Sequence, residues 1–246
     1  KKSEDTNIFT GIASQLLTTQ TADTPVEVLK PPNDKTQVLE RSSSTGSEKI
    51  DVSRPTTVVE GSNIYMLVGK ESRTPTTDPE KRDACGCGLL LVKGSITEIS
   101  GGDKKIYWKD TTDVPQISID NRDDSLTGLI GSGGSGIKTK DGTFVLPVEG
   151  TKKKTTDDTE EDRKTVSLII NSLDAVSWTL SKGMSADGCS DPSVVEWEDN
   201  QLMMMTACDD GRRRVYESGD KGESWTEALG TLSRVWGNKR GGSGVR

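Results

Sequence analysis

Residues 218–225 read Ser-Gly-Asp-Lys-Gly-Glu-Ser-Trp and follow the spacing S-x-D-x-G-x-x-W. Every fixed position of this spacing suits a tight turn between two strands. The carboxylate of Asp220 can accept hydrogen bonds from backbone N–H groups across the turn, and Gly222 can take a positive φ. The indole of Trp225 can pack between neighbouring strands. The stretch therefore predicts a hairpin turn fixed by Ser218, Asp220, Gly222 and Trp225.

A degenerate copy of this spacing lies upstream, where residues 172–178 read Ser-Leu-Asp-Ala-Val-Ser-Trp. The copy keeps Ser172, Asp174 and Trp178, but it is one residue shorter and lacks the glycine. The separation of Asp174 and Asp220 suits one four-stranded unit of a repeating fold. A repeat of this length favours a propeller over a barrel.

The rest of the chain predicts short strands joined by turns, which is an all-β class. Gly61-Ser-Asn63 separates two apolar runs and predicts a hairpin. Residues 11–17 fit either a strand or a helix. Strands are expected at 57–60, 64–68, 89–92, 104–109, 143–148, 165–170, 193–197, 202–205 and 214–217.

Composition excludes several classes of protein. The formal net charge is −7 and the sequence contains no histidine. An acidic chain is a poor partner for nucleic acid, and His-based triads and metal sites are ruled out. No apolar run is long enough to span a membrane. The first residue is Lys1 and no signal peptide is visible, so the chain reads as an internal piece of a longer protein.

Three further motifs have ordinary interpretations. Cys85 and Cys87 are spaced too tightly for a zinc knuckle and lie far from Cys189 and Cys208, so no metal and no cofactor is expected, while disulfide pairing stays open. Residues 131–136 match G-x-G-x-x-G, but a strand and turn are expected after them rather than a helix, which favours a glycine-rich inner strand or loop. Residues 212–214 are three arginines with acidic neighbours, which favours a local charge network over a polyanion site. Residues 202–205, Leu-Met-Met-Met, are expected to fill a core.

Several longer stretches closely resemble the trypanosomal trans-sialidase superfamily. They are residues 53–61, 64–69, 184–197, 212–220 and 230–237. Residues 88–94 and 206–211 resemble the non-enzymatic surface-glycoprotein branch of that superfamily. The resemblance runs from about Asn7 to Lys239, and residues 240–246 look like a truncated or irregular tail.

This resemblance implies a six-bladed sialidase-type β-propeller, of which residues 1–239 form an incomplete portion of about four blades. It also identifies residues 218–225 as an Asp-box (a BNR repeat) and residues 172–178 as a degenerate Asp-box. Asp-boxes are structural, so they indicate fold and not catalysis.

The family's catalytic positions are altered in this chain. Asp191 stands where active members have the glutamate partner of a tyrosine nucleophile, one methylene shorter. Arg54 replaces a substrate-contacting aspartate, and Ala207-Cys208 replaces an arginine that binds the sugar carboxylate. No acid aligns at Asn7-Ile8, the position of the acid/base. The nucleophile and a further arginine would lie beyond Arg246. Since sialosides are held by arginine forks, no turnover is expected.

By resemblance, the expected function is that of a trans-sialidase-like cell-surface glycoprotein, catalytically inactive, that acts in adhesion to or invasion of host cells. The alternatives are an exo-alpha-sialidase or trans-sialidase, and a purely antigenic coat module. Expected partners are host-cell or matrix glycoproteins, with sialoglycans as weaker ligands, no nucleic acid, and a membrane only through an anchor outside this chain. The charged stretches 71–84 and 152–163 are the expected contact loops.

Overall fold

The structure is a computed structural model, and it describes residues 12–14, 37–39, 50–72, 88–98, 104–108, 119–120, 125–152, 164–228, 230, 232 and 235–236. All regular elements within these ranges are strands, apart from one single-residue helical assignment at Leu232. The all-β prediction is therefore confirmed. No helix in the described part of the chain has the length and apolarity to cross a bilayer.

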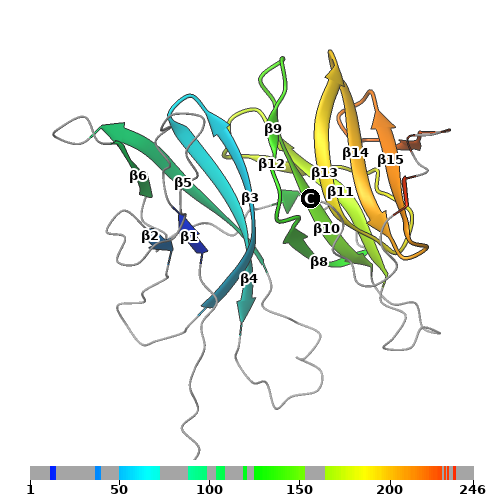
Figure 1. Ribbon diagram of the computed structural model, residues 1–246, viewed down its shortest axis with the longest axis horizontal. Helices are drawn as coiled ribbons and strands as arrows, with labels where there is room; N and C mark the ends of the chain where they lie inside the picture. Colours follow the sequence, from blue (N-terminus) through cyan, green and yellow to red (C-terminus); the bar gives the residue numbers. More distant parts are fainter. Residues whose placement is uncertain are drawn as a thin grey trace, which may run out of the picture.

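Three larger, mainly antiparallel sheets follow one another along the chain (Figure 1). Sheet 1 has the order β3-β4-β5-β6, sheet 2 has the order β7-β12-β11-β10-β8 with β9 also paired to β10, and sheet 3 has the order β13-β14-β15-β16 with β17 also paired to β15. Within sheet 2, β7 pairs with β12 in parallel. A small sheet of β1 and β2 lies beside them. The strands are β1 Ile12–Ser14, β2 Gln37–Leu39, β3 Ile50–Glu60, β4 Asn63–Ser72, β5 Gly88–Glu98, β6 Lys104–Trp108, β7 Ile119–Asp120, β8 Leu126–Gly131, β9 Ile137–Lys138, β10 Phe144–Lys152, β11 Thr165–Ser172, β12 Trp178–Leu180, β13 Cys189–Glu198, β14 Gln201–Cys208, β15 Arg212–Ser218, β16 Thr226–Glu227 and β17 Val235–Trp236.

Local sequence explains these hairpins well. The turn between β3 and β4 contains Gly61 at φ +57°, a conformation that glycine takes without steric cost. Register then pairs Glu60 with Asn63 and Val58 with Tyr65. Every strand predicted from sequence has a counterpart, and the ambiguous segment 11–17 contains the strand Ile12–Ser14.

The hydrophobic core lies between neighbouring sheets. Val58, Leu67 and Leu89 of sheet 1 pack against Leu146, Leu168 and Ile170 of sheet 2. On the next interface, Val145 and Ile169 of sheet 2 pack against Val194, Leu202 and Met204 of sheet 3. Sheet 2 is therefore covered on both faces, which explains why β10 and β11 are nearly continuous apolar runs.

The run Leu-Met-Met-Met at 202–205 is apolar throughout, but its side chains are not equally buried. Leu202 and Met204 are buried in the interface of sheets 2 and 3, as predicted. Met205 is exposed, so the prediction of core filling is wrong at that position. The reason is the alternation of side chains along a strand, which sends consecutive residues to opposite faces.

Candidate functional site

Two strands that belong to different sheets, β3 and β13, contain the same unusual local structure. Ser53-Arg54-Pro55 in β3 and Ser190-Asp191-Pro192 in β13 each form a bulge in the strand register. Arg54 has φ +52° and Asp191 has φ +49°, although neither is glycine. Non-glycine residues in this region are strained and gather at functional sites. The two bulges direct Arg54 and Asp191 toward each other.

Glu149 of β10 lies between these two residues and completes a charged cluster. The Arg54 Nη1 atom donates to Glu149 Oε2 at 3.2 Å, and Nη2 forms an ion pair with Glu149 Oε1. The same Nη2 atom donates to Asp191 Oδ1 at 2.8 Å. The backbone N–H of Asp191 donates to Glu149 Oε1, also at 2.8 Å. One residue from each of the three sheets therefore meets at this cluster, which we call the Arg54 triad.

The triad is supported by a glycine at the end of β8, by the hydroxyl of Ser132 directly after it, and by a hydroxyl of β3. A Cβ atom at Gly131 would lie 2.6 Å from the Arg54 carbonyl oxygen, so only glycine permits this approach of the two strands. The buried hydroxyls of Thr56 and Ser132 lie 3.3 Å apart, and Thr56 Oγ1 accepts the N–H of Gly133. Of the glycine-rich residues 131–136, Gly131 ends β8 and the others form a loop that leads into strand β9, which agrees with the prediction of an inner strand or loop.

Burial governs the electrostatics of the triad. The side chain of Glu149 is buried, and this desolvation raises the pKa of its carboxyl, although the Arg54 guanidinium opposes the shift. The guanidinium is engaged by two carboxylates of its own chain. A third carboxylate, from a ligand, would have to displace one of them. The triad therefore holds the three sheets together and leaves Arg54 poorly suited to bind an anion.

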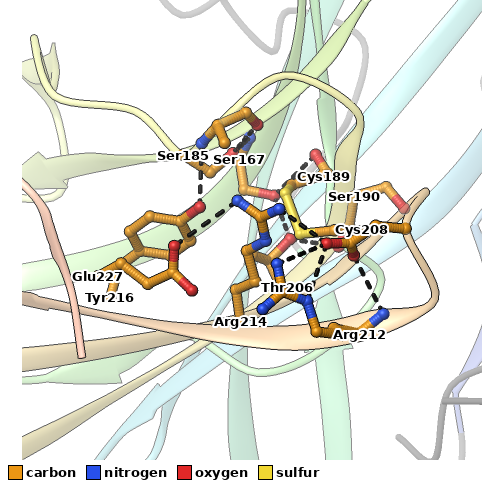
Figure 2. Close-up of a disulfide and its surroundings, with 12 residues drawn as sticks. Ser167, Ser185, Cys189, Ser190, Thr206, Cys208, Arg212, Arg214, Tyr216 and Glu227 are labelled. Carbon is orange, nitrogen blue, oxygen red and sulfur yellow. Dashed lines mark hydrogen bonds and ion pairs between the residues drawn. A yellow bond between two sulfur atoms is a disulfide. The ribbon is translucent and has the colours of Figure 1, made fainter. Parts of the chain in front are cut away.

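The first residues of β13 are fixed by a disulfide between Cys189 and Cys208, which pair across β13 and β14. Figure 2 shows Ser167, Thr206 and Ser190 gathered around this disulfide. Ser167 Oγ donates to the Cys189 carbonyl at 3.1 Å, and Thr206 Oγ1 donates to the Ser190 carbonyl at 2.7 Å. The sequence left the pairing of the cysteines open. The disulfide links the start of β13, the strand that contains Asp191, to the end of β14.

Two of the three arginines at 212–214, Arg212 and Arg214, form a local charge network, as predicted. Arg212 and Arg214 both contact Asp210, and Arg214 also contacts Glu227 (Figure 2). Hydrogen bonds from Arg214 and Arg212 hold the pKa of the Asp210 carboxyl well below its ordinary range. Ala207 pairs with Ser190 in the same hairpin and carries no charge. The position implied for a carboxylate-binding arginine therefore holds no guanidinium.

Both Asp-box candidates make tight turns with similar hydrogen bonds. Asp220 accepts the N–H of Ser224 at 2.9 Å and the hydroxyl of Ser218 at 2.8 Å, while Gly222 has φ +87°. In the shorter copy, Asp174 accepts the N–H groups of Val176 and Ser177 at 2.8 and 2.7 Å, and a hydroxyl from Ser172. These bonds lower the pKa of Asp174 to about 2.

The two tryptophans of these turns pack into different interfaces. Trp178 is buried between sheets 1 and 2, and Trp225 packs against the interface of sheets 2 and 3. Neither motif contacts the Arg54 triad through any described bond. The assignment to the Asp-box stays an interpretation of the sequence, and the geometry gives both turns a structural use.

Sequence reasoning singled out Asp191 and Arg54 but missed Glu149. The available signal was an acidic residue inside the apolar run Val148-Glu149-Gly150 of a central strand, because such a residue is rarely buried without a partner. Several residues and stretches singled out from the sequence lie outside the described residues: Asn7, Cys85, Cys87, 73–84, 153–163 and 240–246. Among the described residues, no group of three or more Cys, Asp or Glu is arranged to hold a metal ion.

The protein has three curled sheets that follow one another along the chain and pack face to face, and the Arg54 triad lies where the three sheets meet. This arrangement is a portion of a sialidase-type β-propeller. The chain matches the BNR repeat-like domain over residues 1–246. It belongs to that family, and its similarity to trypanosomal sialidases places it in the trans-sialidase superfamily.

Two curated relatives come from Trypanosoma cruzi. A sialidase is 34% identical over 188 residues, covering 74% of this chain and 15% of the relative. Sialidase 85-1.1 is 33% identical over 195 residues, covering 77% of this chain and 24% of the relative. Among solved structures, Trypanosoma rangeli sialidase in complex with the inhibitor DANA has a TM-score of 0.66 at 31% identity, covering 82% of this chain and 32% of that chain. The chain thus spans a quarter or less of these two curated relatives.

Proposed function

We propose that this chain is part of a trans-sialidase-like surface glycoprotein that does not hydrolyse sialosides and acts in adhesion to host-cell or matrix glycoproteins. The observation that carries the proposal is that Arg54 stands where active members have a substrate-contacting aspartate, and that its Nη atoms are engaged by Glu149 and Asp191. Ala207 adds to it, because the hairpin beside Asp191 supplies no guanidinium. Among the described residues around Asp191, a sugar carboxylate therefore meets no guanidinium that is free of the chain's own carboxylates, whereas sialoside hydrolysis requires an arginine fork.

The experiment that tests inactivity uses a sialoside with a fluorescent leaving group and, separately, lactose as an acceptor. We expect neither release nor transfer from this chain or from the longer protein that contains it. Turnover that is abolished by Asp191→Asn would overturn the proposal and favour the glycosidase alternative.

Adhesion is tested by measuring binding of the longer protein to immobilised host-cell glycoproteins, before and after enzymatic removal of their sialic acid. We expect binding in both cases, with an association rate that falls as salt rises, because the expected contact stretches 71–84 and 152–163 are charged. Replacing both stretches by short Gly-Asn turns should remove most binding. Unchanged binding that ignores salt would favour the coat-module alternative.

A further inference from the structure

We infer that the disulfide between Cys189 and Cys208 is a positioning element for the Arg54 triad: it holds the bulge of β13 so that Asp191 reaches Arg54. The inference concerns the geometry of the site and not its ligand. Its failure would therefore leave the proposed function standing, and its success does not depend on that function.

The disulfide lies next to the part of β13 that departs from regular pairing. Cys189 and Ser190 are paired with Cys208 and Ala207, and the register then shifts before Ser193. Asp191 falls inside this irregular segment, where ladder hydrogen bonds do not fix the backbone. Its φ of +49° is a conformation that must be imposed by its surroundings.

Covalent and hydrogen-bonded restraints converge on the two peptide units before Asp191. The side chain of Cys189 is fully buried and crosslinked, and its carbonyl accepts the hydroxyl of Ser167 from sheet 2. The carbonyl of Ser190 accepts the hydroxyl of Thr206, which lies 2.7 Å from the Ser167 hydroxyl. Figure 2 shows these groups around the disulfide. The start of β13 is therefore tied to β14 and to sheet 2 at once.

On the other side of the crosslink, the chain turns through Gly188. The N–H of Gly188 donates to Thr165 and its carbonyl accepts the N–H of Asp209, at 2.8 and 2.9 Å. These two bonds and the crosslink lie at the open end of the β13–β14 hairpin, where the regular ladder stops. Without the crosslink, strand ends of this kind open locally while the centre of the sheet stays paired. Asp191 would then move away from Arg54.

The decisive experiment is a double-mutant cycle on the pair Arg54 and Asp191, using Arg54→Met and Asp191→Asn. It is measured by denaturant unfolding in the crosslinked protein and in a Cys189→Ala, Cys208→Ala background. The coupling is the factor by which the unfolding equilibrium constant of the double variant departs from the value expected if the two substitutions acted independently. We expect a coupling of about fivefold with the crosslink and of less than about twofold without it. Equal non-additivity in both backgrounds would overturn the inference, because a crosslink that only restricts the unfolded chain leaves this coupling unchanged.

A matched control pair lies in two turns, the turn between β9 and β10 and the turn between β15 and β16. Lys221 contacts Asp141 at 2.6 Å, and neither residue belongs to the hairpin end that the disulfide closes. The cycle of Lys221→Met and Asp141→Asn should give the same non-additivity with and without the crosslink. Loss of coupling in both cycles would indicate general loosening, which would also overturn the inference.

A second measurement avoids the cysteine substitutions. The disulfide of the unmodified protein is reduced with a phosphine, which becomes a phosphine oxide with oxygen from water while the S–S bond is replaced by two thiols. Amide hydrogen exchange is then compared before and after. We expect the Asp191 amide, which donates to Glu149, to lose protection by about tenfold, while amides in the middle of β14 keep theirs. Unchanged Asp191 protection, or unfolding of the whole chain, would contradict a role confined to the bulge.

Discussion

At the scale of single residues, the most informative group is Glu149, because its position could not be read from the sequence. Arg54 and Asp191 stood out because they fall within stretches that resemble family motifs. Glu149 is held by contacts between three sheets, and such contacts depend on how sheets pack rather than on local pattern. The disulfide pairing was open for the same reason: four cysteines allow several pairings until strands are placed in register.

Burial of Glu149 predicts a specific pH dependence of stability. Its carboxyl has a pKa that is raised in the folded protein, so the folded state keeps the proton to a higher pH than the unfolded state. Stability from this group is therefore full below the ordinary carboxyl pKa and is lost as pH rises through the raised value. We expect the difference in unfolding free energy between the unmodified protein and Glu149→Gln to decrease from acidic to neutral pH. Denaturant unfolding across this range checks it, and a difference that grows with pH would show that Arg54 outweighs burial.

At the scale of elements, hairpins were predictable because turn chemistry and apolar runs are local signals. The β3–β4 hairpin around Gly61 and the turn at 218–225 lie where the sequence predicts them. Local pattern says less about which side chains of a strand face another sheet, as the exposed Met205 shows. It also does not reveal that β8 must approach β3 closely enough to exclude any side chain at Gly131.

This approach predicts different effects for two glycines of one strand. A methyl group at Gly131 would meet the Arg54 carbonyl at 2.6 Å, whereas a methyl group at Gly128 meets nothing within 4 Å. We expect Gly131→Ala to destabilise the protein by about 1–3 kcal/mol and to weaken the coupling of Arg54 and Asp191, because the bulge of β3 must shift. Gly128→Ala should be neutral or stabilising by up to about 1 kcal/mol. Urea unfolding of both variants is the measurement. Equal changes in the free energy of unfolding would mean that β8 can shift to accommodate the methyl group without loss of stability.

At the scale of the whole molecule, the two faces of sheet 3 differ in what covers them. The face with Val194, Leu202 and Met204 packs on sheet 2. The opposite side of β13 and β14 carries Val195 and Met205 at 51% and 36% exposure, with Trp197 at 65% near the end of β13. Val195 pairs with Met203 and Ser193 with Met205, so these apolar side chains adjoin one another. Adjoining exposed apolar residues on a sheet favour association.

We therefore expect this chain in isolation to associate in a concentration-dependent way, through these apolar residues of sheet 3. Analytical ultracentrifugation over a range of concentrations should show the mean mass rising, with little effect of salt, because apolar contact is not screened. The double substitution Trp197→Ser, Met205→Ser should reduce the rise. Leu173→Ser is the matched control, since Leu173 is 71% exposed but lies in the turn after β11 and away from these residues. Association that persists unchanged in the double variant, or that falls equally in the control, would place the contact elsewhere on the molecule. A mean mass that falls as salt rises would instead assign the association to charged side chains.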